Sequence, residues 1–416
     1  MYVRKPSFRG DCEPGWLFID AFRREFPNCS ARIKGERQVL VGLDLLDVKD
    51  VSSLAVRRPV DRGYTVAWDL QHEIWARALR RLFQVPHLTG HHGNVGLVLT
   101  EPYLNLPVLR ESAFRVVFQE LGFSSLLMAP PAVLALHWFA FLTNATASTV
   151  PTPLPPMTRA ATSAGCALVI DAGFSFTHAV PIFDWHVVPG GIRRIDLGGK
   201  ALTNYMKELV SYRSINMMDE SYLLEYIKNQ VCFVSMDPDR DLKAARRKDS
   251  PFRKEWLLPD GVTSVWGHDR DINEPKSPND PILSINNERF MVPEALFNPT
   301  DLGMNEAGLA ETAFRAVAGC HTHLHALLYS NVLIIGGTAR CPGFKERFEA
   351  EFRCLVPDEY MINVTLLEDP HLAAWRGGAV LASARHQQGT LEFSRLAVTK
   401  SEWQQYGAAA AGKWDA

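Results

Sequence analysis

Residues 167–178 constrain the fold of this chain more than any other stretch. A short apolar run ends in Asp171, a small residue and Gly173, and a second β-prone run follows through Val180. This pattern predicts a β-hairpin whose tight turn leaves backbone N–H groups free to bind a phosphate, with the Asp171 carboxylate placed to hold a metal's water shell. An ordinary turn without a ligand produces the same pattern and is the more common case.

A second glycine turn occurs late in the chain. The apolar run 332–335 leads directly into Gly336, Gly337 and Thr338, where the backbone can approach a flat ligand closely. A helix-like stretch follows over 344–352. An ordinary strand-to-helix turn is the alternative interpretation of this segment, but the two turns together suggest two halves of one fold that meet at a cleft.

The composition is typical of a two-lobed globular protein. The 416 residues are 47% hydrophobic and 22% charged, which provides an ample core. Lys and Arg number 44 against 46 Asp and Glu, and the resulting net charge of -2 predicts no overall attraction to nucleic acid. No apolar run reaches the roughly 18 residues of a membrane span, and the polar stretch from Met1 to Glu13 does not resemble a signal peptide.

The cysteine and histidine patterns predict no metal site. The seven cysteines are scattered without a CxxC pair, which favours a reducing compartment and disfavours a zinc module. His321, His323 and His325 come closest to a ligand cluster. The residues that follow, 326–329, favour a helix, and a helix would scatter imidazoles at this spacing.

No catalytic residues are predicted either. The chain contains no G-x-S-x-G, no G-x-x-x-x-G-K-[ST] and no H-E-x-x-H. His178 follows the predicted turn and could orient a water molecule, although a hydrogen-bonded core histidine is the default interpretation.

Two polar segments divide the chain. Residues 143–164 are rich in Pro, Thr, Ala and Ser and are predicted to form a solvent-exposed linker or insertion between a first lobe (1–142) and a second lobe (165–370). A polar insertion over about 237–281 interrupts the second lobe. Its basic residues, with Arg246, Arg247 and Lys248 foremost, could meet DNA phosphates or an acidic partner, and a solvated loop face is the alternative.

Many short motifs together resemble the actin family. They begin near Phe26 and continue almost to the C-terminus, in the order found in actin. The matching stretches are 63–69, 99–102, the hairpin and following helix over 165–205, 287–304, Gly336–Thr338 with Pro342 and Gly343, and 375–378. The resemblance implies an α/β fold of the duplicated ribonuclease-H-like type, with two lobes around a nucleotide-type cleft and residues 371–416 returning to the first lobe.

Finer details resemble the nuclear sixth subfamily of the actin-related proteins. They are the stretches 26–29, 101–103, 174–177, 211–213, 218–220 and 297–299. This resemblance implies a structural subunit of a Swr-type chromatin remodeller, which exchanges the Z variant of histone two-A into nucleosomes. The implied partners are the remodeller's motor ATPase, a zinc-finger companion and other subunits, with nucleosomal DNA or histones contacted indirectly. The implied location is the nucleus, with a cytoplasmic pool as a second location and no membrane.

Departures from actin fall where nucleotide chemistry would occur. The first phosphate hairpin, Asp-Asn-Gly in actin, is missing or atypical, since residues 16–23 contain no glycine turn. Phe174 replaces an acidic residue of the second loop, and Pro131 replaces the glutamine that orients the attacking water. Asn229 replaces an adenosine-side glutamate beside the retained Lys228. Little is left to stabilise a phosphoryl-transfer transition state.

The resemblance also names the residues that any bound nucleotide would contact. No cofactor is expected beyond ATP or ADP as a weak structural ligand. The residues of this degenerate cleft are Asp171, Gly173, Gly199, Lys228, Gly336, Gly337 and Thr338.

Two classes of function compete on this reading. The first is a non-catalytic actin-like scaffold of a remodelling complex, favoured by the lost hairpin, Phe174, Pro131 and the shortened region 30–59. The second is an ATP-binding or ATP-hydrolysing actin-fold protein, either filament-forming or of the chaperone and kinase type. A DNA-binding module resting on 240–254 is a weaker third hypothesis, because the overall charge is near neutral.

Overall fold

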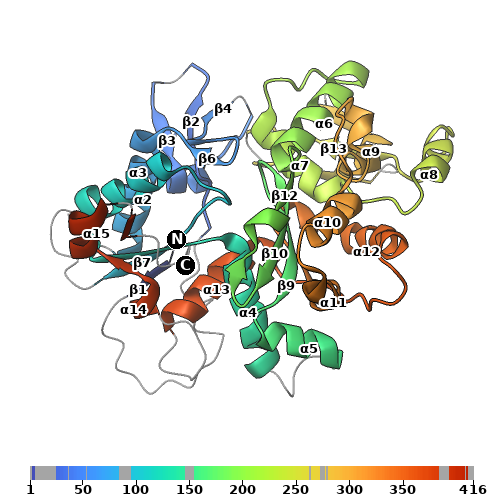
Figure 1. The fold of residues 1–416 in the computed structure, drawn as a ribbon. Helices are drawn as coiled ribbons and strands as arrows, with labels where there is room; N and C mark the ends of the chain where they lie inside the picture. The colour runs from blue at the N-terminus through green and yellow to red at the C-terminus, as the bar shows by residue number, and fades with distance from the viewer. Residues whose placement is uncertain are drawn as a thin grey trace.

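The computed structural model describes residues 2–4, 25–35, 37–52, 54–83, 95–145, 154–261, 264–271, 277, 280–383, 393–407 and 409–410. The segment 16–23, where the first phosphate hairpin is predicted to be missing or atypical, lies outside these residues. Two α/β lobes stand side by side in Figure 1, the first drawn mainly in blue and cyan and the second in green to orange. Among the described residues, no helix is both long enough and apolar enough to cross a membrane.

The first lobe is built on a four-stranded sheet. Its order is β1 (Tyr2–Arg4), β7 (Gly96–Thr100), β8 (Ser125–Ala129) and β18 (Val398–Thr399), with only the central pair parallel. Because β18 pairs with β8, the C-terminal part of the chain belongs to this lobe. The helices are α2 (Trp68–Phe83), α3 (Pro107–Arg115) with a π-helical turn (Val116–Glu120), α14 (Phe393–Leu396) and α15 (Lys400–Tyr406).

Two small sheets extend the first lobe beyond its main sheet. One has the order β3 (Val39–Val41), β2 (Ser30–Ile33), β4 (Leu54–Arg57), and a 3-10 helix (Gly42–Asp47) follows β3. The other is the hairpin of β5 (Val60–Asp61) and β6 (Tyr64–Thr65). Both lie at the same end of the molecule as α6 (Gly199–Arg213) and α7 (Ser221–Val231) of the second lobe (Figure 1).

The second lobe is built on a six-stranded sheet. Its main path is β11 (His186–Val187), β10 (Thr177–Phe183), β9 (Ala167–Ala172), β16 (Val332–Ile335) and β17 (Val364–Leu366), and β12 (Arg193–Ile195) also pairs with β10. Strands β9 and β10 form the predicted antiparallel hairpin, and β16 is the predicted apolar strand. Both β9 and β16 are apolar on both faces because helices cover both sides of the sheet.

Helices and 3-10 turns surround this sheet. The helix predicted to follow the hairpin within 165–205 is confirmed as α6 (Gly199–Arg213). The others are α7 (Ser221–Val231), α9 (Glu288–Glu294), α10 (Leu309–Ala318), α11 (Thr322–Ser330), α12 (Phe344–Leu355) and the 3-10 turns Pro189–Gly191, Pro299–Leu302, Thr338–Arg340 and Pro370–Leu372. The helix predicted to scatter the three histidines is α11, which begins just after His321.

Two helices connect the lobes. α4 (Pro131–Ala145) and α13 (Ala373–Ser383) pack closely between them (Figure 1). On α4, Val133 and Leu136 belong to the apolar cluster that includes β9 and β16, whereas Leu134 belongs to the cluster that includes β7 and β8. A single buried helix therefore contributes to the cores of both lobes and forms the hinge side of the molecule.

The prediction that 143–164 projects into solvent is wrong for its described part beyond residue 153. Residues Pro156–Ser163 form helix α5, on which Thr158 is fully buried. Its hydroxyl donates a hydrogen bond to the Ser330 carbonyl at 2.7 Å, and the Asn331 amide donates one to the Thr162 hydroxyl at 3.2 Å. The small polar side chains that suggested a linker instead satisfy buried groups at the edge of the second lobe.

The insertion over 237–281 also folds in its described part. It contains α8 (Pro238–Ala245), β13 (Lys254–Leu257) and β14 (His268–Arg270), and the two strands form a three-stranded sheet with β15 (Ile282–Ile285). Trp256 is buried in the main core of the second lobe. Arg270 donates to the Glu255 carboxylate at 2.6 Å, with both side chains almost fully buried. The prediction of a largely solvent-projecting insertion is therefore wrong here.

Buried histidines predict a loss of stability in mild acid. His137 on α4 is buried and stacks on Trp185 at 4.3 Å, and its Nε2 has no hydrogen-bond partner among the described residues. Burial lowers the pKa of His137 from 6.5 to about 4. Between these pH values His137 binds a proton in the unfolded chain but stays neutral in the folded chain. The free energy of unfolding is therefore fully present above pH 6.5 and falls as the pH drops toward 4.

We expect His137→Phe, which preserves the stacking, to reduce the loss of unfolding free energy between pH 7 and 4 by up to about 3 kcal/mol. Urea unfolding followed across that pH range measures the change. His268→Gln, at an exposed position, is the control and should leave the pH profile unchanged. Parallel profiles for wild type and His137→Phe would contradict the assignment.

Candidate functional site

The turn between β9 and β10 directs its hydrogen bonds inward. The Gly173 N–H donates to the Phe176 carbonyl at 3.0 Å, which closes the turn. The first two N–H groups of α6 donate to the same turn, Gly199 to the Gly173 carbonyl at 3.1 Å and Lys200 to the Phe174 carbonyl at 2.8 Å. Donors at a helix N-terminus and a glycine turn are the usual phosphate ligands. Here these three donate within the protein, so a phosphate at this turn would have to be bound by other N–H groups.

The seven residues predicted to contact a nucleotide do converge. Thr338 donates its hydroxyl to the Gly173 carbonyl at 2.9 Å, and Lys228 donates to the Gly199 carbonyl at 2.9 Å. Strand β16 lies parallel to β9 with Ile335 opposite Asp171, which places Gly336 beside Ala172. A Cβ at Gly336 would lie 2.2 Å from the Ala172 carbonyl oxygen, so only glycine fits there.

The Lys228 ammonium is held by protein oxygens. Besides the Gly199 carbonyl it donates to the Thr203 hydroxyl at 3.0 Å, and the side chain is buried. Burial lowers the pKa of Lys228. Gly337 differs from its neighbours, because a Cβ there would meet only His371, at 3.9 Å.

A tyrosine caps the candidate metal-binding carboxylate. The Tyr103 hydroxyl donates to Asp171 Oδ2 at 2.9 Å and accepts the Ala132 N–H at 3.1 Å. Tyr103 is buried, and its ring packs against that of His178 at 4.8 Å. Burial is the main cause of the raised pKa of Asp171, which the Tyr103 hydrogen bond only partly offsets. The carboxylate is therefore engaged internally and its charged form is disfavoured.

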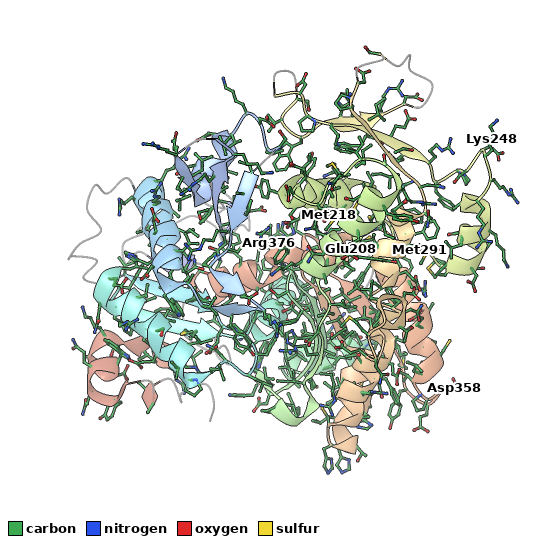
Figure 2. The ribbon with its side chains drawn as sticks, turned by 90° about the horizontal axis from the view of Figure 1, so that it is seen from above. Glu208, Met218, Lys248, Met291, Asp358 and Arg376 are labelled. Carbon is green, nitrogen blue, oxygen red and sulfur yellow. The ribbon has the colours of Figure 1, made fainter. Side chains whose placement is uncertain are left out.

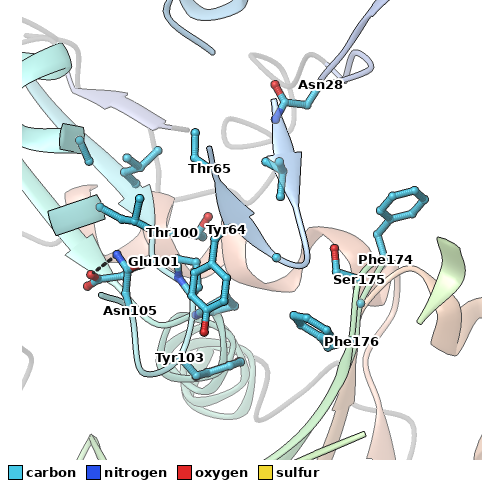
Figure 3. A pocket seen from close by; sticks show the side chains of 18 of the residues that line it. Asn28, Tyr64, Thr65, Thr100, Glu101, Tyr103, Asn105, Phe174, Ser175 and Phe176 are labelled. Carbon is cyan, nitrogen blue, oxygen red and sulfur yellow. Dashed lines mark hydrogen bonds between the residues drawn. The ribbon is translucent and has the colours of Figure 1, made fainter. Parts of the chain in front are cut away.

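A cavity of about 650 Å³ lies on the first-lobe side of the hairpin (Figure 3). Its aromatic and polar lining comes from both lobes and includes Tyr64, Trp68, Glu101, Tyr103, Asn105, Phe174, Phe176 and Pro131. Of the seven predicted residues only Asp171 and Gly173 line it. The other five lie beyond Phe174, whose ring is within 3.6 Å of where a Gly199 Cβ would be. The cavity therefore reaches only the Asp171 and Gly173 end of the predicted nucleotide group.

The basic candidates lie elsewhere. Arg246, Arg247 and Lys248 follow α8 and are all exposed. Lys248 lies at the outer edge of the second lobe in Figure 2. They do not line the cavity, and as exposed side chains they are available for a surface contact.

Sequence reasoning missed the residues that decide the character of this site. The sequence marks Tyr103 only as part of the subfamily stretch 101–103. The one local signal is an aromatic residue within the motif that follows the apolar run 96–99. Arg58 and Glu225, which form an ion pair at 2.8 Å, carry no local signal because they are far apart in sequence.

Comparison with known proteins agrees with this fold. The sequence profile of the family described as "Actin" matches residues 15–413. A protein named "Actin-related protein 6" from Arabidopsis thaliana is 42% identical, and the match covers 88% of this chain and 86% of that protein. This chain belongs to the actin family. The predicted two-lobed actin-like fold is confirmed.

Further relatives of this actin-family member belong to the sixth subfamily of actin-related proteins. "Actin-related protein 6" from Oryza sativa subsp. japonica is 40% identical over 97% of this chain and 94% of its own length. "Actin-like protein ARP6" from Yarrowia lipolytica is 37% identical over 92% of this chain and 90% of its own length. The predicted resemblance to the sixth subfamily of actin-related proteins is therefore confirmed.

Proposed function

We propose that this actin-related protein is a non-catalytic structural subunit of a nuclear Swr-type chromatin-remodelling complex that exchanges the Z variant of histone two-A. Similarity to proteins named actin-related protein 6 supports the choice of assembly. The observation that carries the non-catalytic part is the 2.9 Å hydrogen bond from Tyr103 to Asp171.

Phosphoryl transfer requires three kinds of group, and this site offers a reduced set of them. It needs a carboxylate open to a hydrated metal, N–H donors directed at phosphate oxygens and a polar group that orients water. Here the Tyr103 hydroxyl donates to one oxygen of the Asp171 carboxylate, and the N–H groups of Gly173 and Gly199 donate to backbone carbonyl groups. Pro131 offers no polar side chain. ATP or ADP would be at most a weak structural ligand.

The proposed partners follow from the subfamily. They are the motor ATPase, a zinc-finger companion and other subunits of the complex, with nucleosomal DNA or histones contacted indirectly. The exposed basic cluster of Arg246, Arg247 and Lys248 is the first candidate for a DNA or acidic-protein contact. Surface segments held on a rigid scaffold are common places for such contacts.

The proposal is tested by purifying the tagged protein from nuclei. We expect a Swr-type motor ATPase to co-purify, and the isolated chain to show no ATP hydrolysis above background. Absence of that motor would contradict the assembly, and turnover that Asp171→Ala abolishes would contradict the non-catalytic assignment.

Charge reversal in the same preparation tests the basic cluster. Replacing Arg246, Arg247 and Lys248 with Glu should weaken complex or nucleosome binding, more strongly at low salt, where screening is least. A control reverses the exposed Arg32, Arg57 and Arg395. Equal binding by both triple variants would place the docking surface outside 246–248.

A further inference from the structure

The end of the cleft opposite α4 and α13 is bridged by direct contacts between the lobes. Arg58 follows β4 in the first lobe, and its Nη2 donates to Glu225 Oε2 on α7 of the second lobe at 2.8 Å. The two side chains are 28% and 27% exposed, so solvent screens this pair only partly. The contact joins segments separated by 167 residues in sequence.

Arg58 also packs on Phe174, in the turn between β9 and β10. Its guanidinium carbon lies 4.5 Å from the centroid of the Phe174 ring, a cation–π distance. The Phe174 ring also lies close to the start of α6, since its Cδ2 atom is 3.6 Å from where a Gly199 Cβ would be. Phe174 is therefore held between the first lobe and the group formed by Gly199, Lys228 and Thr338.

A second contact reinforces the first. Gly63, at the turn of the β5–β6 hairpin, lies so close to Phe176 that a Cβ would meet the ring at 2.9 Å. Phe176 in turn carries the Arg194 guanidinium at 4.2 Å from its centroid. The hairpin of the first lobe is thus packed onto the aromatic turn of the second lobe.

We propose that Arg58 is an interlobe clamp that restrains opening of the two lobes and keeps Phe174 over the Gly199–Lys228–Thr338 group. The lobes are joined by α4 and α13 on one side. On the other side they are joined by Arg58, Glu225 and Phe174, and also by an apolar cluster in which residues of β2 and β4 share the core of the second lobe. Two separated attachment points restrain rotation about a hinge, so the lobes are held together at this end of the cleft by side chains of the chain itself. This inference does not depend on which complex contains the protein.

Hydrogen exchange of the full chain, measured by mass spectrometry without nucleotide, tests the clamp. In Arg58→Met we expect the exchange rate of amides in 59–67 and 199–200 to rise about tenfold, because a partly buried ion pair and a cation–π contact are lost together. Glu225→Gln should give a smaller rise. The double variant should resemble Arg58→Met rather than the product of both effects, because the two residues act through one contact.

The matched control is Lys34→Met, which removes another interlobe ion pair, Lys34 with Asp219 at 3.1 Å. Its side chains are 54% and 79% exposed, so we expect less than a twofold change. Amides of β16 report general unfolding and should remain unchanged in every variant. Unchanged exchange in Arg58→Met, or a rise that includes β16 equally, would overturn the clamp.

Discussion

Arg347→Met is expected to destabilise the second lobe by about 3–5 kcal/mol, the usual cost of removing one partner of a buried ion pair. Arg347 on α12 is buried and holds the Glu294 carboxylate with both terminal nitrogens, at 2.9 and 3.1 Å. It also donates to the Ser235 carbonyl. Glu294 is 1% exposed, so the substitution leaves a carboxylate that water cannot reach.

Denaturant unfolding of wild type and variant measures this loss. Arg315→Met is the matched control, because Arg315 pairs with Glu311 one helical turn away on an exposed surface. Such a pair contributes about 0.3–0.5 kcal/mol. Comparable losses in the two variants would show that burial does not determine the strength of the Arg347 pair.

Gly377→Ala is expected to cost about 3 kcal/mol, near the upper end for overpacking a core. A Cβ at Gly377 on α13 would lie 1.7 Å from the Leu134 carbonyl oxygen on α4. Because that atom is helix backbone, the two connecting helices must separate. Both lobes should lose stability, since α4 contributes to the cores of both.

The neighbouring glycine provides the control. A Cβ at Gly378 would meet Val98 Cγ1 at 3.3 Å, and a side-chain methyl can move by a few tenths of an ångström. Alanine is also about 1 kcal/mol better than glycine inside a helix, so Gly378→Ala should be nearly neutral. Thermal unfolding that gives the same shift for both variants would contradict the close-contact explanation.

Local patterns predicted much of the secondary structure. The helix-like stretch 344–352 lies within α12, the β9–β10 hairpin turns at Gly173, and the following helix begins at Gly199. These predictions hold because periodicity and glycine turns act within a few residues of one another. Composition misled over 156–163, where Thr158 and Thr162 bond to buried groups that belong to distant segments.

The sequence by itself determined the family, the two-lobed fold and the positions where nucleotide residues would converge. Only the tertiary structure decided what those positions can do. The hydrogen bond that caps Asp171 comes from Tyr103, and the ion pair that helps hold the lobes together at one end of the cleft joins Arg58 to Glu225. Contacts between residues so far apart in the chain depend on how the lobes pack, and no short-range pattern encodes the distance between two side chains on different lobes.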